Sequence, residues 1–364
     1  MTRWAVATAF LLLAAGCSEE VGPGTSSGGA PTNDGTRLEV DVPASGRVFL
    51  RLAEPEVVVP AGDGAESTDW DLAFSGYDVL TNSGLSGPGD GGALPISRED
   101  YEAGELPGTP YLIADDAGGA FTRWYAYDSA EHVIYSRFHV HAIEHEGRYW
   151  KLQIITFYGE VQGTPVRALY RLRYAEVLPE GPGPAVDIEA LDATAGGIET
   201  DDTAPSACLD LAGNRELMLT PAEASASTAW HVCFRRSLIT VNGELGGPGK
   251  TRGADLHDAE TADEDKNLDE VMQRTAASEA ARFDAIGYDT LADPAVPYRG
   301  DHIATAFTGR WLEPGSNPPA PAKDVAWLIQ GADGQSRFVL VVDGFEGATA
   351  SSPGRVAIRV KQVE

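Results

Sequence analysis

The stretch Trp70-Asp71-Leu72-Ala73-Phe74 decides the fold, because the chain carries a version of it twice. The first copy continues into a Gly-rich loop that contains Asn82 and ends at Gly87-Pro88-Gly89. The second copy is Trp230-His231-Val232-Cys233-Phe234, followed by Asn242 and Gly247-Pro248-Gly249, at a constant offset of 160 positions. Two copies at so long a spacing predict tandem globular domains rather than a solenoid.

The spacing between matching residues of the two copies is larger at the end of the copies than at their start. Phe157 aligns with Phe345 and Arg171 with Arg359, an offset of 188, so about 28 residues are inserted in the second copy. These extra residues fall near 255–288. Within 267–283 the apolar residues recur at helical spacing, with acids at the start and an arginine near the end, which predicts an amphipathic helix.

The remaining sequence predicts an all-β protein, because its 41 glycines and 23 prolines separate apolar runs of strand length. Strands are expected near 37–42, 47–52, 70–74, 79–82, 132–136, 138–144, 149–158, 168–176, 229–234, 237–241, 325–330, 337–342 and 355–363, and the core pattern of the second copy resumes at 208–219. One run should be two-faced, with Trp150, Leu152 and Ile154 opposite Tyr149, Lys151 and Gln153. The Pro/Gly segment 179–185 predicts a linker between a first domain, 37–178, and a second domain, 186–364.

The first 17 residues are typical of a bacterial lipoprotein signal peptide. Arg3 precedes an apolar run that is too short to span a bilayer, and Ala14-Ala15-Gly16-Cys17 forms a small-residue cleavage site. Cys17 would carry the lipid through its sulfur. Residues 18–36 predict a flexible tether. We therefore expect an exported protein anchored to the outer membrane or the cell surface.

The net charge of −28 argues against nucleic acid as a partner. In an oxidising compartment, the two cysteines left after lipidation of Cys17 predict a structural disulfide between Cys208 and Cys233.

The first copy resembles the HmuY family of haem-binding bacterial lipoproteins over about 38–177. The resemblance rests on the Trp70 stretch, the Thr81-Asn82-Ser83-Gly84-Leu85-Ser86-Gly87 loop, Trp124-Tyr125-Ala126-Tyr127-Asp128, His132-Val133-Ile134, the run from Gly147 to Ile154 and Phe157-Tyr158-Gly159. The second copy is similar but more divergent. The resemblance implies two tandem HmuY-like antiparallel β domains and haem ligated by His or Met. It also implies delivery of haem to an outer-membrane transporter.

A haem site needs an aromatic slot and one or two axial donors. The first copy offers His132, His139 and His141 beside Trp124, Tyr125 and Tyr127. His139 and His141 leave one face of a strand, so they cannot bind opposite sides of one iron. One of them would pair with His132 or with a residue from another loop. The 188 offset places Trp327 and Ile329 at their positions in the second copy, which predicts at most one site.

Two other functions stay open. His139-x-His141 with His145 could bind zinc or copper. The scaffold could instead bind a protein or another hydrophobic ligand. We expect no enzyme, because no hydrolase elbow, His-Glu-x-x-His helix, phosphate loop or paired-cysteine zinc motif is present.

Overall fold

The computed structural model describes residues 34–62, 64–104, 106, 110–196, 203–349 and 352–363. These residues form antiparallel sheets with few helices, which confirms the all-β class. The predicted signal peptide, Cys17 and residues 18–33 of the tether lie outside the described residues. The tether was predicted to reach residue 36, but Thr36 already begins the first strand. None of the helices in the described ranges has the length and apolar character needed to cross a bilayer.

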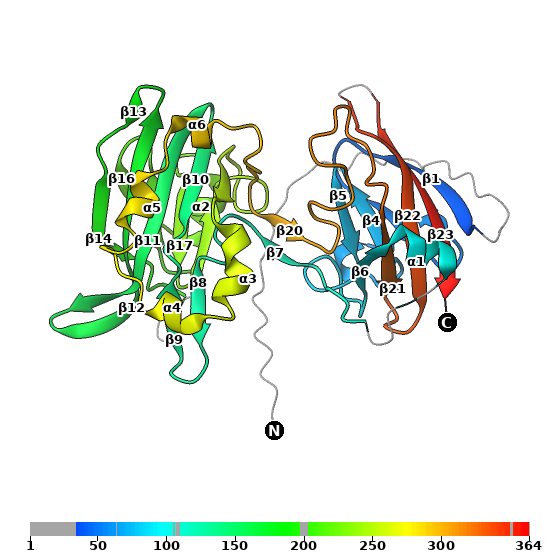
Figure 1. Cartoon of the computed structure of the whole chain (residues 1–364), viewed down its shortest axis with the longest axis horizontal. Coiled ribbons are helices and arrows are strands. Elements are labelled where there is room, and N and C mark those ends of the chain that lie inside the picture. The colour runs from blue at the N-terminus through cyan, green and yellow to red at the C-terminus, as the bar shows by residue number, and fades with distance from the viewer. Residues whose placement is uncertain are drawn as a thin grey trace.

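The strands form two units, which lie side by side in Figure 1. The terminal unit combines the blue and red ends of the chain. Its larger sheet has the order β1 (Thr36–Val42), β23 (Gly354–Val363), β22 (Arg337–Glu346), β21 (Val325–Gln330) and β6 (Gly92–Ser97). Its smaller sheet has the order β3 (Glu56–Val58), β2 (Val48–Arg51), β4 (Leu72–Ser75) and β5 (Asp78–Thr81).

The central unit repeats this plan with the middle of the chain. Its larger sheet has the order β13 (Gly181–Pro182), β12 (Thr164–Leu178), β11 (Arg148–Val161), β10 (Val140–His145) and β19 (Arg252–Asp255), with β14 (Val186–Asp192) also paired to β12. Its smaller sheet has the order β16 (Arg215–Leu219), β15 (Ser206–Asp210), β17 (Val232–Arg235) and β18 (Leu238–Val241). A hairpin, β8 (Tyr125–Asp128) and β9 (Val133–Ser136), extends from it.

The two units are not the two copies of the repeat, so the predicted domains 37–178 and 186–364 are wrong as folding units. β1 pairs with β23 at the far end of the sequence, with Val40 opposite Val356. β14, which opens the second copy, pairs with β12 of the first, with Ile188 opposite Leu172. Each unit therefore joins the first half of one copy to the second half of the other.

The segment 179–185 explains the exchange, because it is a turn inside a sheet rather than a linker between domains. Gly181 and Pro182 pair with the end of β12, and the chain reverses directly into β14. A connection this short places consecutive antiparallel strands next to each other. The start of the second copy, β14, therefore joins the sheet that contains β12, the last long strand of the first copy.

Two short strands carry the chain between the units. β7 (Asp116–Gly118) leads into the central unit, β20 (His302–Ala304) leads out of it, and they pair with Ala117 opposite Ile303. These residues are 186 positions apart, close to the offset of the repeat. Equivalent segments thus pair with each other, which is the relation expected of a two-fold exchange of halves.

The repeated sequence motif has the same structural role in both units. The side-chain amide of Asn82 donates to the carbonyl oxygens of Ser67 and Trp70, and its oxygen accepts from the Gly89 N–H. Asn242 makes the equivalent bonds with the oxygens of Ser227 and Trp230 and with Gly249 N–H. Trp70 and Trp230 are buried. The Trp and Asn positions are therefore explained by structure in both copies.

Each larger sheet has an inner face packed on the smaller sheet and an outer face covered by helices. Trp150, Leu152 and Ile154 lie in the inner core of the central unit. Lys151, on the opposite face as predicted, donates to the carbonyl oxygens of Phe283 and Ile286 at 2.8 and 2.9 Å. In the terminal unit α1 (Arg98–Ala103) packs Tyr101 on the outer face.

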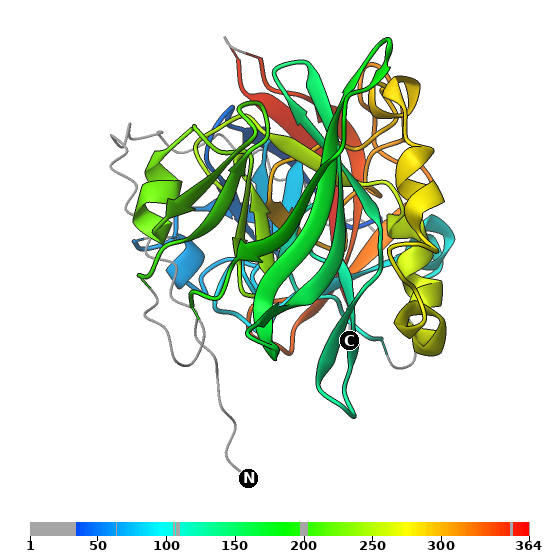
Figure 2. The same ribbon diagram turned by 90° about the vertical axis from the view of Figure 1, so that its left-hand side faces the viewer.

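The inserted residues form a series of short helices on the outer face of the central unit, where Figure 2 shows them along one side of the long strands. They are η2 (Asp258–Glu260), α3 (Thr261–Glu264), α4 (Leu268–Met272), α5 (Ala280–Asp284) and α6 (Tyr288–Leu291). The remaining helical segments are η1 (Gly64–Glu66) and α2 (Pro221–Ala226). The single helix predicted over 267–283 is interrupted, because Thr275 and Ser278 bond each other's backbone N–H groups and replace helical hydrogen bonds.

Candidate functional site

The predicted haem ligand His132 lies on an exposed turn of the β8–β9 hairpin. Its backbone is left-handed, with φ of 57°, and its Nδ1 lies 2.7 Å from the hydroxyl of Tyr127. Tyr127 is itself 51% exposed. This pair stabilises a solvent-facing turn and lines no part of the cleft described below.

Two other predicted slot residues, Trp124 and Tyr125, belong to the inner core of the central unit. Trp124 is buried and its indole N–H donates to the Ser237 carbonyl oxygen at 3.0 Å. The Tyr125 ring packs edge-on against it at 4.9 Å. Their aromatic surface is used in packing.

His141 is also buried, and its ring packs on Phe121 at 4.3 Å. Burial lowers the pKa of His141 to about 4, so the ring is neutral at pH 7. Its Nδ1 has no hydrogen-bond partner within the described ranges. His145 lies at the far end of β10 beside His231, with ring centroids 4.7 Å apart. The structure therefore does not gather His139, His141 and His145 around one ion.

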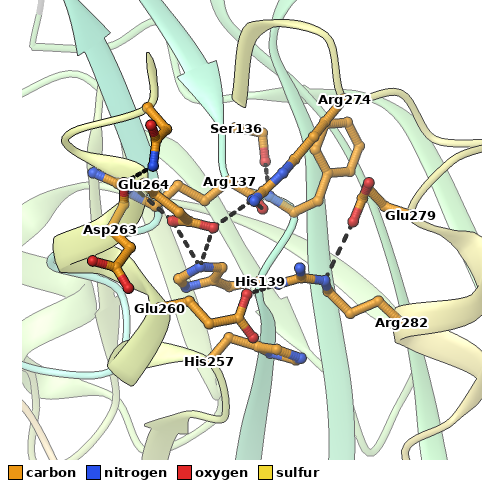
Figure 3. A network of polar contacts seen from close by, with 12 residues as sticks. Ser136, Arg137, His139, His257, Glu260, Asp263, Glu264, Arg274, Glu279 and Arg282 are labelled. Atoms are coloured by element: carbon orange, nitrogen blue, oxygen red, sulfur yellow. Dashed lines mark hydrogen bonds and ion pairs between the residues drawn. The ribbon is translucent and has the colours of Figure 1, made fainter. Parts of the chain in front are cut away.

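His139 occupies the centre of a polar network between the sheet and the insertion (Figure 3). Its Nδ1 lies 2.7 Å from Asp255 on β19, and its Nε2 lies 3.1 Å from Glu264 on α3. Both nitrogens can donate only when the ring is an imidazolium. Burial would lower the pKa of His139, but the hydrogen bonds that the ring donates to the carboxylates of Asp255 and Glu264 outweigh burial and raise it.

Two arginines complete this network around Glu264. Arg137, just before β10, donates to it at 2.9 Å, and Arg274 donates at 2.5 Å. Burial would raise the pKa of Glu264, but hydrogen bonds from His139 and Arg274 reverse the effect and lower it to about 2. Arg137 and Glu264 are almost fully buried. The ionic network holds α3 against the edge of the sheet, since a buried charge is stable only when it is paired.

Glu260 brings a second carboxylate to the same place. Single ligand atoms of His139, Glu260 and Glu264 all lie within 4.8 Å of one another. Glu260 is exposed and also pairs with Arg282 at 3.0 Å. One imidazole nitrogen and two carboxylates form a donor set that divalent transition metals accept.

A cleft of about 1000 Å³ lies between the two units. β7 and β20 contribute to it, and its walls include Tyr77, Trp311 and Leu312 from the terminal unit and Ala120, Arg123 and Asp255 from the central unit. Arg299 bridges the units beside it, donating to Asp78 at 2.8 Å and to Glu244 at 2.6 Å. None of His132, His139 and His141 lines this cleft.

One histidine does line the cleft, and the sequence analysis did not single it out. His302 on β20 donates from Nδ1 to the Gly300 carbonyl oxygen at 2.9 Å, which directs Nε2 away as a free lone pair. A Cβ at Gly118 would lie 2.8 Å from that Nε2. The backbone of β7 therefore lies close to this nitrogen, and a side chain at position 118 would press on His302 and on Ala304, whose Cβ it would approach to 2.9 Å.

Cys208 and Cys233 lie directly opposite each other on β15 and β17 and form a disulfide. The bond joins two strands of the smaller sheet in the central unit. It is a structural link between two buried or half-buried residues.

The polar network was missed because its members are far apart in sequence. Arg137 and Glu264 are separated by 127 positions, and His139 and Asp255 by 116. The available signal was the acidic start of the insertion, whose charges need partners. His302 was missed because it belongs to no repeated motif.

No protein-family model matches this sequence, and no curated protein is significantly similar to it.

Proposed function

We propose that this protein binds haem, without transforming it, in the cleft between its two β units. The observation that carries the proposal is His302, whose imidazole is held by Gly300 at 2.9 Å and lines a cleft of about 1000 Å³. A histidine that donates its other N–H to a carbonyl oxygen is well oriented to bind a metal through the free nitrogen.

The walls of the cleft suit a flat, largely apolar ligand. Tyr77 and Trp311 line it, each packing on Phe345 within the terminal unit. Leu312 adds apolar surface. Arg310 lies at the same wall and forms no ion pair with the described residues. Its guanidinium would pair with a propionate of the ligand.

The proposal changes the predicted ligands but keeps the predicted ligand class. His132 is on an outer turn, His141 is packed on Phe121, and His139 is bonded to two carboxylates. Moving His139 or His141 onto an iron would break existing ion pairs or packing, and His132 lies outside the cleft. His302 needs no such rearrangement.

The proposed biological role is haem capture at the cell surface. Cys17 would carry the lipid anchor, and the bound haem would pass to an outer-membrane transporter. The resemblance of the repeat motifs to the HmuY family supports this role. An open cleft, rather than a closed cavity, suits a protein that both loads and releases its ligand.

A hemin titration of the purified mature chain tests the proposal. Wild type should develop a saturable Soret band. His302→Ala should remove it or weaken hemin binding at least tenfold, because the axial nitrogen is lost. His132→Ala, which changes an exposed histidine outside the cleft, is the matched control and should bind as wild type does.

A second variant separates ligand geometry from the loss of an imidazole. Gly118→Ala places a methyl group beside Nε2 of His302 and should weaken hemin binding while leaving the histidine present. The proposal is overturned if wild type shows no saturable band, or if His132→Ala loses the band and His302→Ala keeps it. Absence of any band would favour the protein- or hydrophobic-ligand-binding function.

A further inference from the structure

A cluster of potential ligand atoms lies where the insertion meets the sheet, away from His302. The His139 ring is fixed from behind, because its Nδ1 lies 2.7 Å from the Asp255 carboxylate. A carboxylate in this position orients the imidazole and makes its other nitrogen a better metal donor. Nε2 consequently points at α3.

Two carboxylates meet that nitrogen. Glu264 presents both oxygens to Nε2, at 3.1 and 3.2 Å. Glu260 contributes a third ligand atom, and all three atoms fit within 4.8 Å of one another. Metal–ligand bonds of about 2.0–2.2 Å hold adjacent donors roughly 3 Å apart or slightly more, so the most widely separated of these atoms would have to approach by up to about 1.5 Å to close around one ion.

The three groups differ in their exposure to solvent. His139 and Glu264 are buried, whereas Glu260 is exposed. In Figure 3 Glu260 lies at the side of the His139 ring below Glu264. An ion could therefore enter from the Glu260 side and keep water in its remaining coordination positions.

Three neighbouring arginines affect both the affinity of the cluster for a metal ion and the positions of its carboxylates. Arg137 and Arg274 already share the charge of Glu264, and Arg282 pairs with Glu260 at 3.0 Å. These cations weaken the attraction for a metal ion, so occupancy should be reversible. They also hold the carboxylates in place when no ion is bound, which preorganises the donors.

We propose that His139 Nε2, Glu264 and Glu260 bind a divalent first-row transition-metal ion of the zinc class. The ion takes the place of the proton between Nε2 and Glu264, and that proton leaves to solvent. Asp255 acts as the positioning residue, because it touches His139 and not the ion. Binding ties α3 and η2 of the insertion to the residue that directly precedes β10.

The experiment uses the mature chain, freed of metal by chelation and free of haem. Co²⁺ should give a saturable visible absorption band, Zn²⁺ should displace it, and Zn²⁺ should raise the melting temperature. Glu260→Gln should weaken Co²⁺ binding at least tenfold without unfolding the protein, because Glu260 is exposed. His139→Asn should abolish the band.

Two matched variants test the donor assignment. Glu279→Gln changes the other carboxylate that pairs with Arg282, at 3.3 Å, and should leave Co²⁺ binding unchanged. His257→Ala changes the imidazole whose ring centre lies 5.6 Å from that of His139 and should also leave binding unchanged. The proposal is overturned if wild type shows no saturable Co²⁺ band, or if Glu260→Gln binds as tightly as wild type. Loss of binding in either matched variant also contradicts this donor set.

Discussion

The central and terminal units have the same strand order but fill one equivalent position with different chemistry. In the terminal unit Trp327 of β21 stacks on Phe307 at 4.9 Å. In the central unit His141 of β10 packs on Phe121 at 4.3 Å. Phe121 and Phe307 are 186 positions apart, as are His141 and Trp327, so the aromatic neighbour is the same.

A histidine that belongs to a metal-binding type of motif, His141 of His139-x-His141, can therefore serve as a core residue. His141 lies where the other unit has a buried tryptophan. The 188 offset aligns Trp327 with His139, but the strand register makes Trp327 the equivalent of His141, because Trp327 pairs with Pro95 of β6 as His141 pairs with Asp255 of β19. The central unit has replaced an apolar edge by charged groups, with Asp255 directly across from His141. The insertion docks on these charged groups.

The largest expected difference between the units concerns the buried ion pair of Arg137 and Glu264, which has no counterpart at the equivalent edge among the described residues of the terminal unit. Arg137→Ala leaves the Glu264 carboxylate buried with one cation fewer and should destabilise the protein by about 3–5 kcal/mol. Urea denaturation measures the effect. Arg98→Ala is the control, because Arg98 pairs with Asp343 at the partly exposed surface of the terminal unit and should cost about 1 kcal/mol or less. Equal losses of unfolding free energy in Arg137→Ala and Arg98→Ala would contradict the expected difference between the buried and the partly exposed ion pair.

The disulfide is a second difference at an equivalent position. Cys208 pairs with Cys233 across β15 and β17, whereas the terminal unit has Phe49 opposite Ala73. The bond closes a loop with a sequence separation of 25, so replacing both cysteines by alanine should cost about 3 kcal/mol. Denaturation with and without reductant measures this. A loss below about 1 kcal/mol would mean that packing alone holds the two strands.

The residue after the repeated tryptophan is Asp71 in the terminal unit and His231 in the central unit, and this difference should make stability depend on pH. Asp71 accepts the Leu52 N–H, and His231 accepts the Leu211 N–H on its Nδ1 at 3.2 Å. Burial lowers the pKa of His231 from 6.5 to about 4. Between these values the unfolded chain binds a proton that the folded protein excludes, so stability falls as pH falls, by about 2–3 kcal/mol.

His231→Asn retains an acceptor for the Leu211 N–H but does not titrate. It should flatten the loss of stability between pH 6.5 and 4, measured by urea midpoints across that range. An unchanged pH profile would show that another group causes the loss.

The smallest expected effect comes from two equivalent carboxyl groups beside the crossing strands. Asp115 accepts from the Thr81 N–H and from the hydroxyls of Thr81 and Ser86, and burial raises its pKa to about 6 despite these bonds. Asp301 has the Val241 N–H instead, and burial raises its pKa to about 7. The folded Asp301 stays protonated where the unfolded chain ionises, so this group lowers stability as pH rises from 3.8 towards 7.

Asp301→Asn keeps an acceptor for Val241 and remains neutral. It should therefore be more stable than wild type at pH 8, on the order of 2 kcal/mol after allowance for partial solvent exposure, and equal to it near pH 4. Asp115→Asn should gain less, because the ionised Asp115 has more hydrogen-bond donors. Thermal melts at the two pH values measure both variants, and a larger gain at Asp115 would contradict the comparison.

The sequence predicted most strands because each one has a local signature. β21 begins and ends where the apolar run predicted, and the two faces of β11 follow from strict alternation around Trp150. The short edge strands β6 and β19 were missed. Their Gly- and Ala-rich sequences carry no alternating pattern.

The residues of the candidate sites were harder to predict from the sequence than the strands. Strand periodicity correctly identified His139 and His141 as neighbours, but periodicity carries no information about a partner more than a hundred positions away. Glu264 and Asp255 reach His139 only because the insertion folds back over the edge of β19. His302 acquires its cleft only where the two units meet.

By itself the sequence determined that the chain is a duplicated β protein with one helical insertion, because repeats and apolar periods are local properties. Only the tertiary structure decided which halves fold together. β1 and β14 occupy equivalent positions, beside β23 and β12 respectively, so the repeat alone does not determine which of them pairs with which partner. The short turn after β12 places β14 beside it and leaves β1 to complete the sheet at the other end of the chain.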